Sequence, residues 1–200
     1  MKGVWLVNLP HSPVFSSKDR INRALDSLVG LGCNAIFPVV WNRGYTLFPS
    51  QVMVGYGLPA IAAPYQAQQR DPLQELVEAA TARHMQIFPW FEYGFAASHL
   101  PNGGHILAKY PDWCGQDHEG KPLKHGGLIW LNAFNPQVQN FLVKLVLEVV
   151  NNYAVTGIQG CDRFPASPVT GGYDSLTQKK FQAQFQKSPP ANYQAKHWVK

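Results

Sequence analysis

The sequence is poor in charged residues, and acids are the scarcest of them. Only 14% of the 200 residues are charged, and 12 Asp and Glu stand against 17 Lys and Arg, which gives a net charge of +5. Proteins that bind nucleic acid cluster their basic residues in patches interleaved with aromatic side chains. The sequence has no such basic stripe, so we do not expect nucleic acid as a partner.

Cysteine and long apolar runs are also scarce. Cys33, Cys114 and Cys161 are odd in number and lack the spacing of a metal site or a disulfide framework. No apolar run approaches the ~20 residues that cross a bilayer, and the N-terminus enters a strand pattern at once, without a signal peptide. We therefore expect no metal, no cofactor, no membrane span and a cytoplasmic location, unless an upstream segment is missing.

Aromatic side chains, in contrast, are abundant. The sequence has six Trp, eight Tyr and eleven Phe within a hydrophobic fraction of 46%. Such rings line ligand pockets, where they can stack on the apolar faces of sugars, and they also fill ordinary cores. Both interpretations remain open for these rings.

Four short apolar runs alternate with amphipathic helical patterns. The runs predict strands at 3–9, 33–40, 86–93 and 157–161, and the helical patterns cover 17–31, 71–80, 136–149 and 173–185. Ser16 or Ser17 and Asp71 are the expected N-caps of the first two helices. The continuous apolar run at 3–9 is typical of a strand buried on both faces. This order indicates an α/β fold with a parallel sheet and right-handed crossovers.

The loops that follow the strands are much longer than those that follow the helices. This asymmetry is typical of a (β/α)8 barrel, whose chemistry lies at the carboxyl ends of its strands. The sequence therefore predicts a partial (β/α)8 TIM-type barrel of about four βα units over residues 1–187, with a Pro-containing tail at 188–200. A doubly wound sheet is the alternative, although no Gly-rich phosphate turn follows the first strand.

Two acids stand at predicted strand ends, Glu92 and Asp162. Glycoside hydrolysis generally needs two carboxyl groups, one protonated and one ionised, on either side of the scissile bond. Trp90 and Phe91 would give Glu92 an apolar setting that favours its protonated form, and Arg163 would keep Asp162 ionised. The pattern indicates a catalytic pair, and an ion pair that only shapes the barrel mouth is the competing interpretation.

The side chains around these acids suit a sugar ligand. Aromatic rings offer stacking planes, and amide, phenol and guanidinium groups offer hydrogen bonds to hydroxyls. The predicted substrate-binding residues are Trp41, Asn42, Tyr45, Trp90, Tyr93, Asn132 and Arg163. The alternative is that Trp41 and Trp90 only seal the top of the barrel.

Four separated stretches resemble one known family. They are VVWNRGYTLFPS at 39–50, PWFEYGF at 89–95, WLNAFNP at 130–136 and GIQGCDRFP at 157–165. In this order they resemble the glycosyl-hydrolase-like family ten proteins of bacteria, whose domain is a (β/α)8 barrel. The resemblance runs from Lys2 to Trp198. It implies a glycoside hydrolase that acts on an oligo- or polysaccharide by paired-carboxylate acid/base chemistry.

The sequence departs from the family pattern in two places. The first of the paired acids after the fourth strand is replaced by Cys161, and Thr156 stands where the family commonly has an acid. The family also continues through four more strands. A full barrel takes about 250 residues, so this sequence would hold only part of one. A non-catalytic carbohydrate-binding half-barrel or an inactive gene fragment is therefore the alternative. Exposed sheet edges promote association, so we also expect a homodimer that closes the half-barrel.

Overall fold

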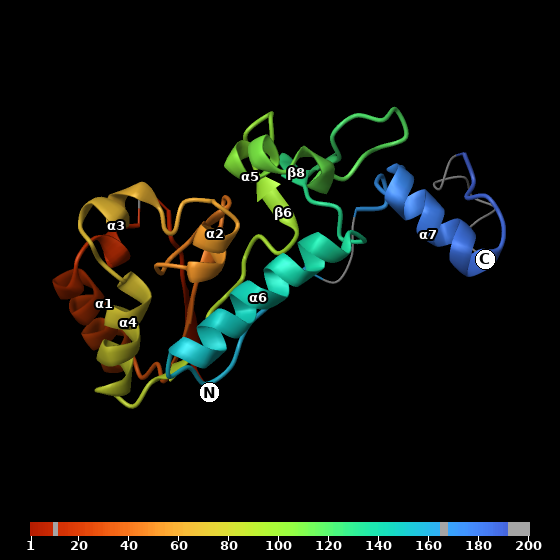
Figure 1. Ribbon diagram of the computed structural model, residues 1–200. Coiled ribbons are helices and arrows are strands. Elements are labelled where there is room, and N and C mark those ends of the chain that lie inside the picture. The colour runs from red at the N-terminus through yellow and green to blue at the C-terminus, as the bar shows by residue number, and fades with distance from the viewer. Residues whose placement is uncertain (10–11, 165–167, 192–200) are drawn as a thin grey trace. The chain divides into compact units, whose positions relative to one another are not determined.

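The computed structural model describes residues 1–9, 12–164 and 168–191. The chain divides into two compact units, and Figure 1 labels their helices and strands. The first unit comprises Met1–Gly94 and Val143–Cys161, and the second comprises Phe95–Leu142 and Asp162–Lys200. A single barrel domain over 1–187 stays a prediction. Of the expected tail, residues 188–191 contain no helix or strand, and 192–200 lie outside the described residues.

A parallel sheet forms the core of the first unit. Its strands are β1 (Gly3–Leu6), β2 (Ala35–Pro38) and β5 (Gln86–Ile87), in the order β1-β2-β5. β1 pairs with β2 along its whole length, and β2 pairs with β5 through two residues. Parallel neighbours need a crossover, and right-handed βα units supply it. The predicted α/β class and strand direction are confirmed.

The predicted fourth strand is present as a single bridge. Gln159 pairs in parallel with Trp90, and its N–H donates to the carbonyl oxygen of Pro89 at 2.9 Å. The N–H of Phe91 donates back to the carbonyl of Gln159 at 2.9 Å. The four extended segments therefore lie in the same order in space as in the sequence. A doubly wound sheet reverses its order at a switch point, so the observed order favours the barrel.

Two amphipathic helices follow β1 and precede β5. They are α1 (Lys18–Gly30) and α4 (Pro72–Thr81), and they pack against each other. Ser17 and Asp71 cap them as predicted, each accepting a hydrogen bond from the N–H three residues later, at 3.2 Å and 2.9 Å. The helices bury an apolar stripe made of Ile21, Leu25, Leu73, Leu76, Val77 and Ala80. Ser16, the other expected cap, lies in a 3-10 turn, η1 (Pro13–Ser16).

The two faces of the sheet differ. Ile36 and Ile87 are register partners and are 0% and 2% exposed, so they lie on the covered face. Because successive side chains alternate between faces, Phe37 and Phe88 lie on the other face. There Trp5, Phe37 and Phe88 form a stacked row with centroid separations of 5.0 Å and 5.2 Å. Trp5 is 52% exposed, so the expectation of a first strand buried on both faces is wrong.

Two glycines provide the space for this aromatic row. A Cβ on Gly3 would lie 2.5 Å from Cε2 of Phe37, and a Cβ on Gly157 would lie 3.2 Å from Cδ1 of Phe88. Glycine inside a strand often marks a place where another group approaches the backbone closely. The ring of Phe37 in β2 therefore lies over Gly3 in β1, and the ring of Phe88, just after β5, lies over Gly157.

The long loop at 41–70 contains structure that the sequence analysis did not predict. It holds β3 (Trp41–Asn42), β4 (Tyr45–Thr46), α2 (Gln51–Gly55) and α3 (Ala63–Ala67). β3 and β4 form an antiparallel hairpin whose turn residues, Arg43 and Gly44, have φ of 53° and 78°. Two left-handed residues are typical of the tightest hairpin turn.

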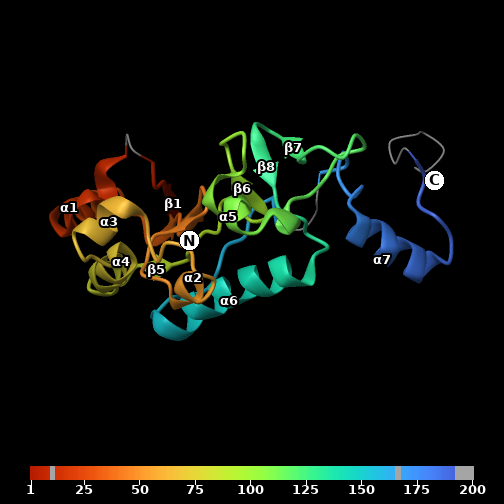
Figure 2. The same ribbon diagram turned by 45° about the horizontal axis from the view of Figure 1, so that its top comes forward.

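The second unit contains a small antiparallel sheet. Its strands are β6 (Ala96–Ser98), β7 (Lys124–His125) and β8 (Leu128–Trp130), in the order β6-β8-β7. Figure 2 shows α5 (Gly104–Lys109) beside this sheet, and the 3-10 turn η2 (Pro111–Trp113) follows it. α7 (Ser175–Phe185) lies in this unit, whereas α6 (Pro136–Asn152) begins in the second unit and ends in the first.

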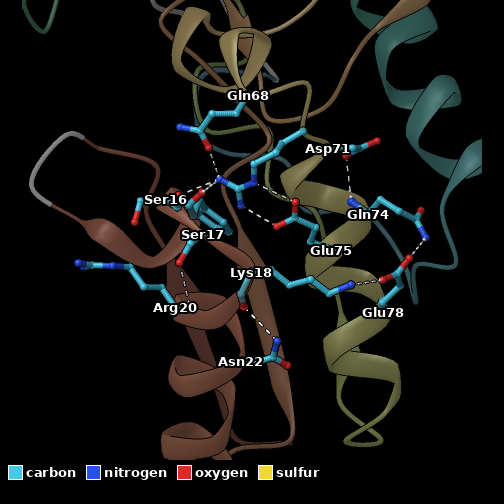
Figure 3. A network of polar contacts seen from close by, with 12 residues as sticks. Ser16, Ser17, Lys18, Arg20, Asn22, Gln68, Asp71, Gln74, Glu75 and Glu78 are labelled. Atoms are coloured by element: carbon cyan, nitrogen blue, oxygen red, sulfur yellow. Dashed lines mark hydrogen bonds and ion pairs between the residues drawn. The ribbon is translucent and has the colours of Figure 1, made fainter.

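A polar network joins the start of α4 to the start of α1 (Figure 3). Arg70 donates to both carboxylate oxygens of Glu75, at 2.9 Å and 2.6 Å. It also donates to the carbonyl oxygens of Phe15 and Ser16, at 3.2 Å and 2.9 Å. The side chains of Arg70 and Glu75 are 15% and 17% exposed. A bidentate pair in this partly buried setting fixes the loop before α4.

Arg70→Ala should lower the free energy of unfolding by about 3 kcal/mol, because it leaves the Glu75 carboxylate and two carbonyl groups without their donor. Urea unfolding followed by circular dichroism measures this. Lys18→Ala is the matched control, since Lys18 and Glu78 form an ion pair between α1 and α4 whose side chains are 60% and 51% exposed. Lys18→Ala should change the free energy of unfolding far less than Arg70→Ala, because exposed ion pairs contribute little. Equal losses in both variants would contradict the special role of Arg70.

Asp71→Asn should make the fold less sensitive to pH. Burial raises the pKa of Asp71, while hydrogen bonds from the Gln74 N–H and the Tyr153 hydroxyl oppose the shift. A raised pKa in the folded state means that the contribution of this group is fully present below about pH 4 and is lost as pH rises through the folded pKa. Asn also caps helices well. The variant should therefore match the wild type near pH 4 and exceed it at pH 7.

Urea unfolding at both pH values tests this expectation. Asp71→Ala is the control, because it removes the cap as well as the charge and should lose about 1 kcal/mol across the range. An Asp71→Asn variant that is less stable than the wild type at pH 7 would show that the charge of Asp71 supports the fold.

Candidate functional site

The carboxyl ends of three neighbouring strands bring polar side chains together in the first unit. Asn8 follows β1, Asn42 lies shortly after β2, and Glu92 follows β5. The amide nitrogen of Asn42 donates to the backbone carbonyl of Asn8 at 3.2 Å and to Oε2 of Glu92 at 3.4 Å. This is the edge at which barrel enzymes carry their chemistry. The structure thus joins two of the predicted site residues, Asn42 and Glu92.

Asn8 is the centre of a wider set of contacts that the sequence analysis missed. The Tyr65 hydroxyl donates to Oδ1 of Asn8 at 3.0 Å, and Nη2 of Arg43 donates to the Asn8 carbonyl at 3.0 Å. Burial raises the pKa of Tyr65, against the opposing charges of Arg70 and Arg43, so the phenol stays a donor at neutral pH. The only sequence signal for Asn8 was its position at the end of the first predicted strand.

The predicted aromatic residues of the hairpin are integrated into the fold to different extents. Trp41 is 0% exposed, and its indole N–H donates to the carbonyl oxygen of Gly94 at 3.2 Å. The N–H of Tyr93 donates to the Trp41 carbonyl at 3.2 Å. These contacts favour the sealing interpretation for Trp41. Tyr45 is half-buried and pairs with Asn42 across the hairpin.

Two buried donors near these strand ends have no hydrogen-bond partner in the described part of the chain. They are Nε1 of Trp90 and Nε of Arg43. A buried donor without a partner costs about 1–3 kcal/mol. Trp90 lies two residues after Phe88 and therefore on the same face of the sheet as the aromatic row.

Cys161 contacts the backbone of Glu92, which follows β5. Its half-buried thiol donates to the backbone carbonyl of Glu92 at 2.8 Å. Cys33 is buried and Cys114 is half-buried, and neither forms a disulfide bond. The Cys161 thiol therefore lies against the main chain of a predicted catalytic residue, at a position where the resemblance implies an acid.

The second predicted acid belongs to the other unit. Asp162 is exposed, and Arg163 is half-buried, with its carbonyl accepting from the Phe95 N–H at 3.1 Å. Glu92 falls in the first unit and Asp162 in the second. The pairing of these two carboxyl groups therefore stays a prediction.

Asn132, a predicted substrate-binding residue, lies in a buried network of the second unit. Its side-chain amide donates to Oδ1 of Asp174 at 2.8 Å, and its Oδ1 accepts from the N–H of Phe134 at 2.9 Å. Asp174 is the N-cap of α7 and accepts from the N–H of Thr177 at 2.9 Å. Asn132 and Asp174 are 4% and 8% exposed, so the network anchors the start of α7.

Across the residues that the structure describes, no group of three or more His, Cys, Asp or Glu side chains is arranged to hold a metal ion. A search of the same residues finds no helix with the length and apolar character needed to cross a membrane.

The sequence matches one family along its whole length. The family model for Glycosyl hydrolase-like 10 matches residues 1–200. Glycosyl hydrolase DigH from Escherichia coli strain K12 is 28% identical over 206 residues, which cover 92% of this chain and 47% of that protein. Glycosyl hydrolase YngK from Bacillus subtilis strain 168 is 22% identical over 189 residues, so the chain spans about half of DigH and 34% of YngK.

Solved structures share the fold. Alpha-L-fucosidase isoenzyme 2 from Paenibacillus thiaminolyticus has a TM-score of 0.69 at 19% identity, covering 96% of this chain and 27% of that one. A hypothetical protein from Ruminiclostridium thermocellum has a TM-score of 0.62 at 13% identity, covering 96% of this chain and 94% of that one. Identities this low show the fold alone, and they confirm the predicted partial barrel.

Proposed function

Because the chain belongs to the glycosyl hydrolase-like 10 family, we propose that it acts in glycoside hydrolysis on an oligo- or polysaccharide. Glu92 and Asp162 are the proposed carboxyl pair. The observation that carries the proposal is the contact between Asn42 and Glu92 at the carboxyl ends of the strands, where barrel enzymes bind and transform their substrates. The names of the relative DigH and of the fucosidase neighbour agree with this substrate class.

The proposed roles follow from the chemistry of each group. Glu92 would protonate the leaving oxygen, and Asp162 would act as nucleophile or base. Tyr45, Trp90, Tyr93 and Arg163 would contact the sugar, and the partnerless indole N–H of Trp90 supports this, since a sugar hydroxyl could accept from it.

A non-catalytic carbohydrate-binding half-barrel is the second candidate. The observation that favours it is Cys161, whose thiol stands at a position where the family resemblance implies an acid and bonds to the main chain of Glu92. A thiol is a poor substitute for a carboxylate in acid and base catalysis, because its pKa is ordinarily about 8.5. The chain would then keep its aromatic and amide side chains for binding while its hydrolysis is weak or absent.

Glu92→Gln and Asp162→Asn should each lower hydrolysis of chromogenic glycosides by about 100-fold or more, because each removes a group that takes part in the transition state. The measurement is release of the chromophore from a panel of substrates. Gln86→Glu is the control for altered charge, since Gln86 is exposed at the amino end of β5. Wild-type activity that survives both substitutions would remove these residues from the mechanism.

Cys161→Asp separates the two candidates. If the thiol has impaired a catalytic site, the added carboxyl group should raise the rate of hydrolysis, while sugar binding by isothermal titration calorimetry changes little. A wild type and a variant that both bind sugars without hydrolysing them would favour the binding half-barrel.

The expected homodimer also remains a proposal. The face of the sheet that carries Trp5, Phe37 and Phe88 supports it, because this row is apolar and Trp5 is 52% exposed. Phe37 has a stacked ring on either side, and the apolar row suits apolar protein side chains. A second copy presents the same row, so a two-fold contact would cover both at once.

Trp5→Ser should weaken dimerisation by about tenfold or more, because an exposed Trp at an apolar contact is a typical hot spot. Sedimentation velocity over a concentration series measures the dissociation constant. Leu31→Ser is the control, since Leu31 is 66% exposed, follows α1 and is not part of the sheet. A wild-type chain that sediments as a monomer at every concentration would refute the proposed dimer.

We retain the cytoplasm as the proposed location, with carbohydrate as the partner. The odd number of cysteines and their lack of disulfide spacing support it, because disulfide frameworks belong to oxidising compartments. Recovery of the chain in an exported or membrane fraction of the producing cell would contradict it.

A further inference from the structure

Asn42 was expected to bind substrate, but its surroundings point to a different task. Its side chain is 2% exposed, and it lies in β3 of the hairpin, paired with Tyr45. The tight turn that follows, with Arg43 and Gly44 in left-handed conformations, fixes the hairpin backbone. A side chain that is held and covered in this way is poorly placed to contact a sugar.

The hydrogen bonds of Asn42 are directed at protein groups. One primary amide carries two N–H groups. The acceptors within reach of Nδ2 are the Asn8 carbonyl at 3.2 Å and Oε2 of Glu92 at 3.4 Å. Both donors are therefore engaged within the protein.

Asn8 is in turn fixed from two sides. The Tyr65 hydroxyl donates to its Oδ1 at 3.0 Å, and Nη2 of Arg43 donates to its carbonyl at 3.0 Å. Hydrogen bonds thus link Tyr65 to the side chain of Asn8, the backbone carbonyl of Asn8 to Asn42, and Asn42 to the carboxylate of Glu92. This network joins α3 to residues that follow β1, β2 and β5.

We propose that Asn42 is a positioning residue that orients the carboxyl group of Glu92 for glycoside hydrolysis. This inference rests on the proposed function of Glu92. A neutral amide donor can orient one carboxylate oxygen without adding a charge of its own. A displacement of a reacting group by about 1 Å can lower a rate by about 100-fold, which makes such positioning effective.

The kinetic test compares Asn42→Ala and Asn42→Asp with the wild type on the chromogenic glycoside that the wild type hydrolyses best. Loss of positioning should lower kcat by about tenfold or more while KM stays within about threefold. Asn42→Asp should lower kcat further, because its carboxylate lacks the donor and repels Glu92. A rise in KM with kcat unchanged would mean that Asn42 binds substrate and would overturn the proposal.

Asn34→Asp is the matched control. Asn34 is exposed just before β2, at the opposite end of the same strand, and its Oδ1 accepts from the backbone N–H of Lys2 at 2.8 Å. An aspartate keeps this acceptor. The control therefore makes the same chemical change away from the site, and it should leave kcat and KM unchanged.

A second measurement does not depend on catalysis. NMR relaxation of 13C-labelled glutamate side chains, with the Glu92 signal assigned through Glu92→Gln, reports how rigidly that side chain is held. Asn42→Ala should lower the order parameter of the Glu92 side chain, whereas Asn34→Asp should not. An unchanged order parameter in a folded Asn42→Ala variant would overturn the proposal.

The two measurements separate failure of the inference from failure of the proposed function. Hydrolysis that is absent in the wild type, or unaffected by Glu92→Gln, would count against the proposed function, and the relaxation data would still decide whether Asn42 orients Glu92. Circular dichroism and thermal unfolding of each variant identify a misfolded protein. If Asn42→Ala does not fold, Asn42→Leu, which keeps the size of the side chain but has no donor, replaces it in the comparison.

Discussion

In-register parallel pairing of the extended segments is the constraint on which the candidate site depends. Gly3–Leu6 pairs with Ala35–Pro38 residue by residue, and β5 and the bridge at Gln159 continue the same direction. Parallel strands that share a register end at one edge, so the residues that follow them meet there. The contact between the Asn42 amide and the Glu92 carboxylate is a consequence of this alignment.

The two faces of that sheet are stabilised in different ways. Ile36 and Ile87 are buried on one face, where α4 contacts β5 and packs against α1. The bidentate pair between Arg70 and Glu75 fixes the approach to α4. The other face carries the stacked row that begins at Trp5, and glycine at positions 3 and 157 gives the neighbouring rings their space. Covered and uncovered faces on one sheet are what a barrel wall presents when its interior is open to solvent.

Periodicity and capping chemistry made the regular elements predictable. The helices that begin after Ser17 and Asp71 start where their caps indicate, because a cap and an apolar stripe are local signals. The hairpin, α2 and α3 were missed, since short polar elements leave no periodic pattern in a loop. The burial of the first strand was predicted wrongly, because an apolar run does not reveal whether both of its faces are covered.

The sequence by itself determined the alternation of strands and helices, the family resemblance and the presence of an acid just after the third strand. Tertiary structure alone decided which side chains meet at that edge. Asn42 bonds to Asn8 and Glu92, which are 34 and 50 residues away along the chain, and Tyr65 reaches Asn8 across 57 residues. Composition and spacing show that an amide is present. Only the packing of strands and loops into a register decides whether that amide faces a sugar or holds a carboxylate.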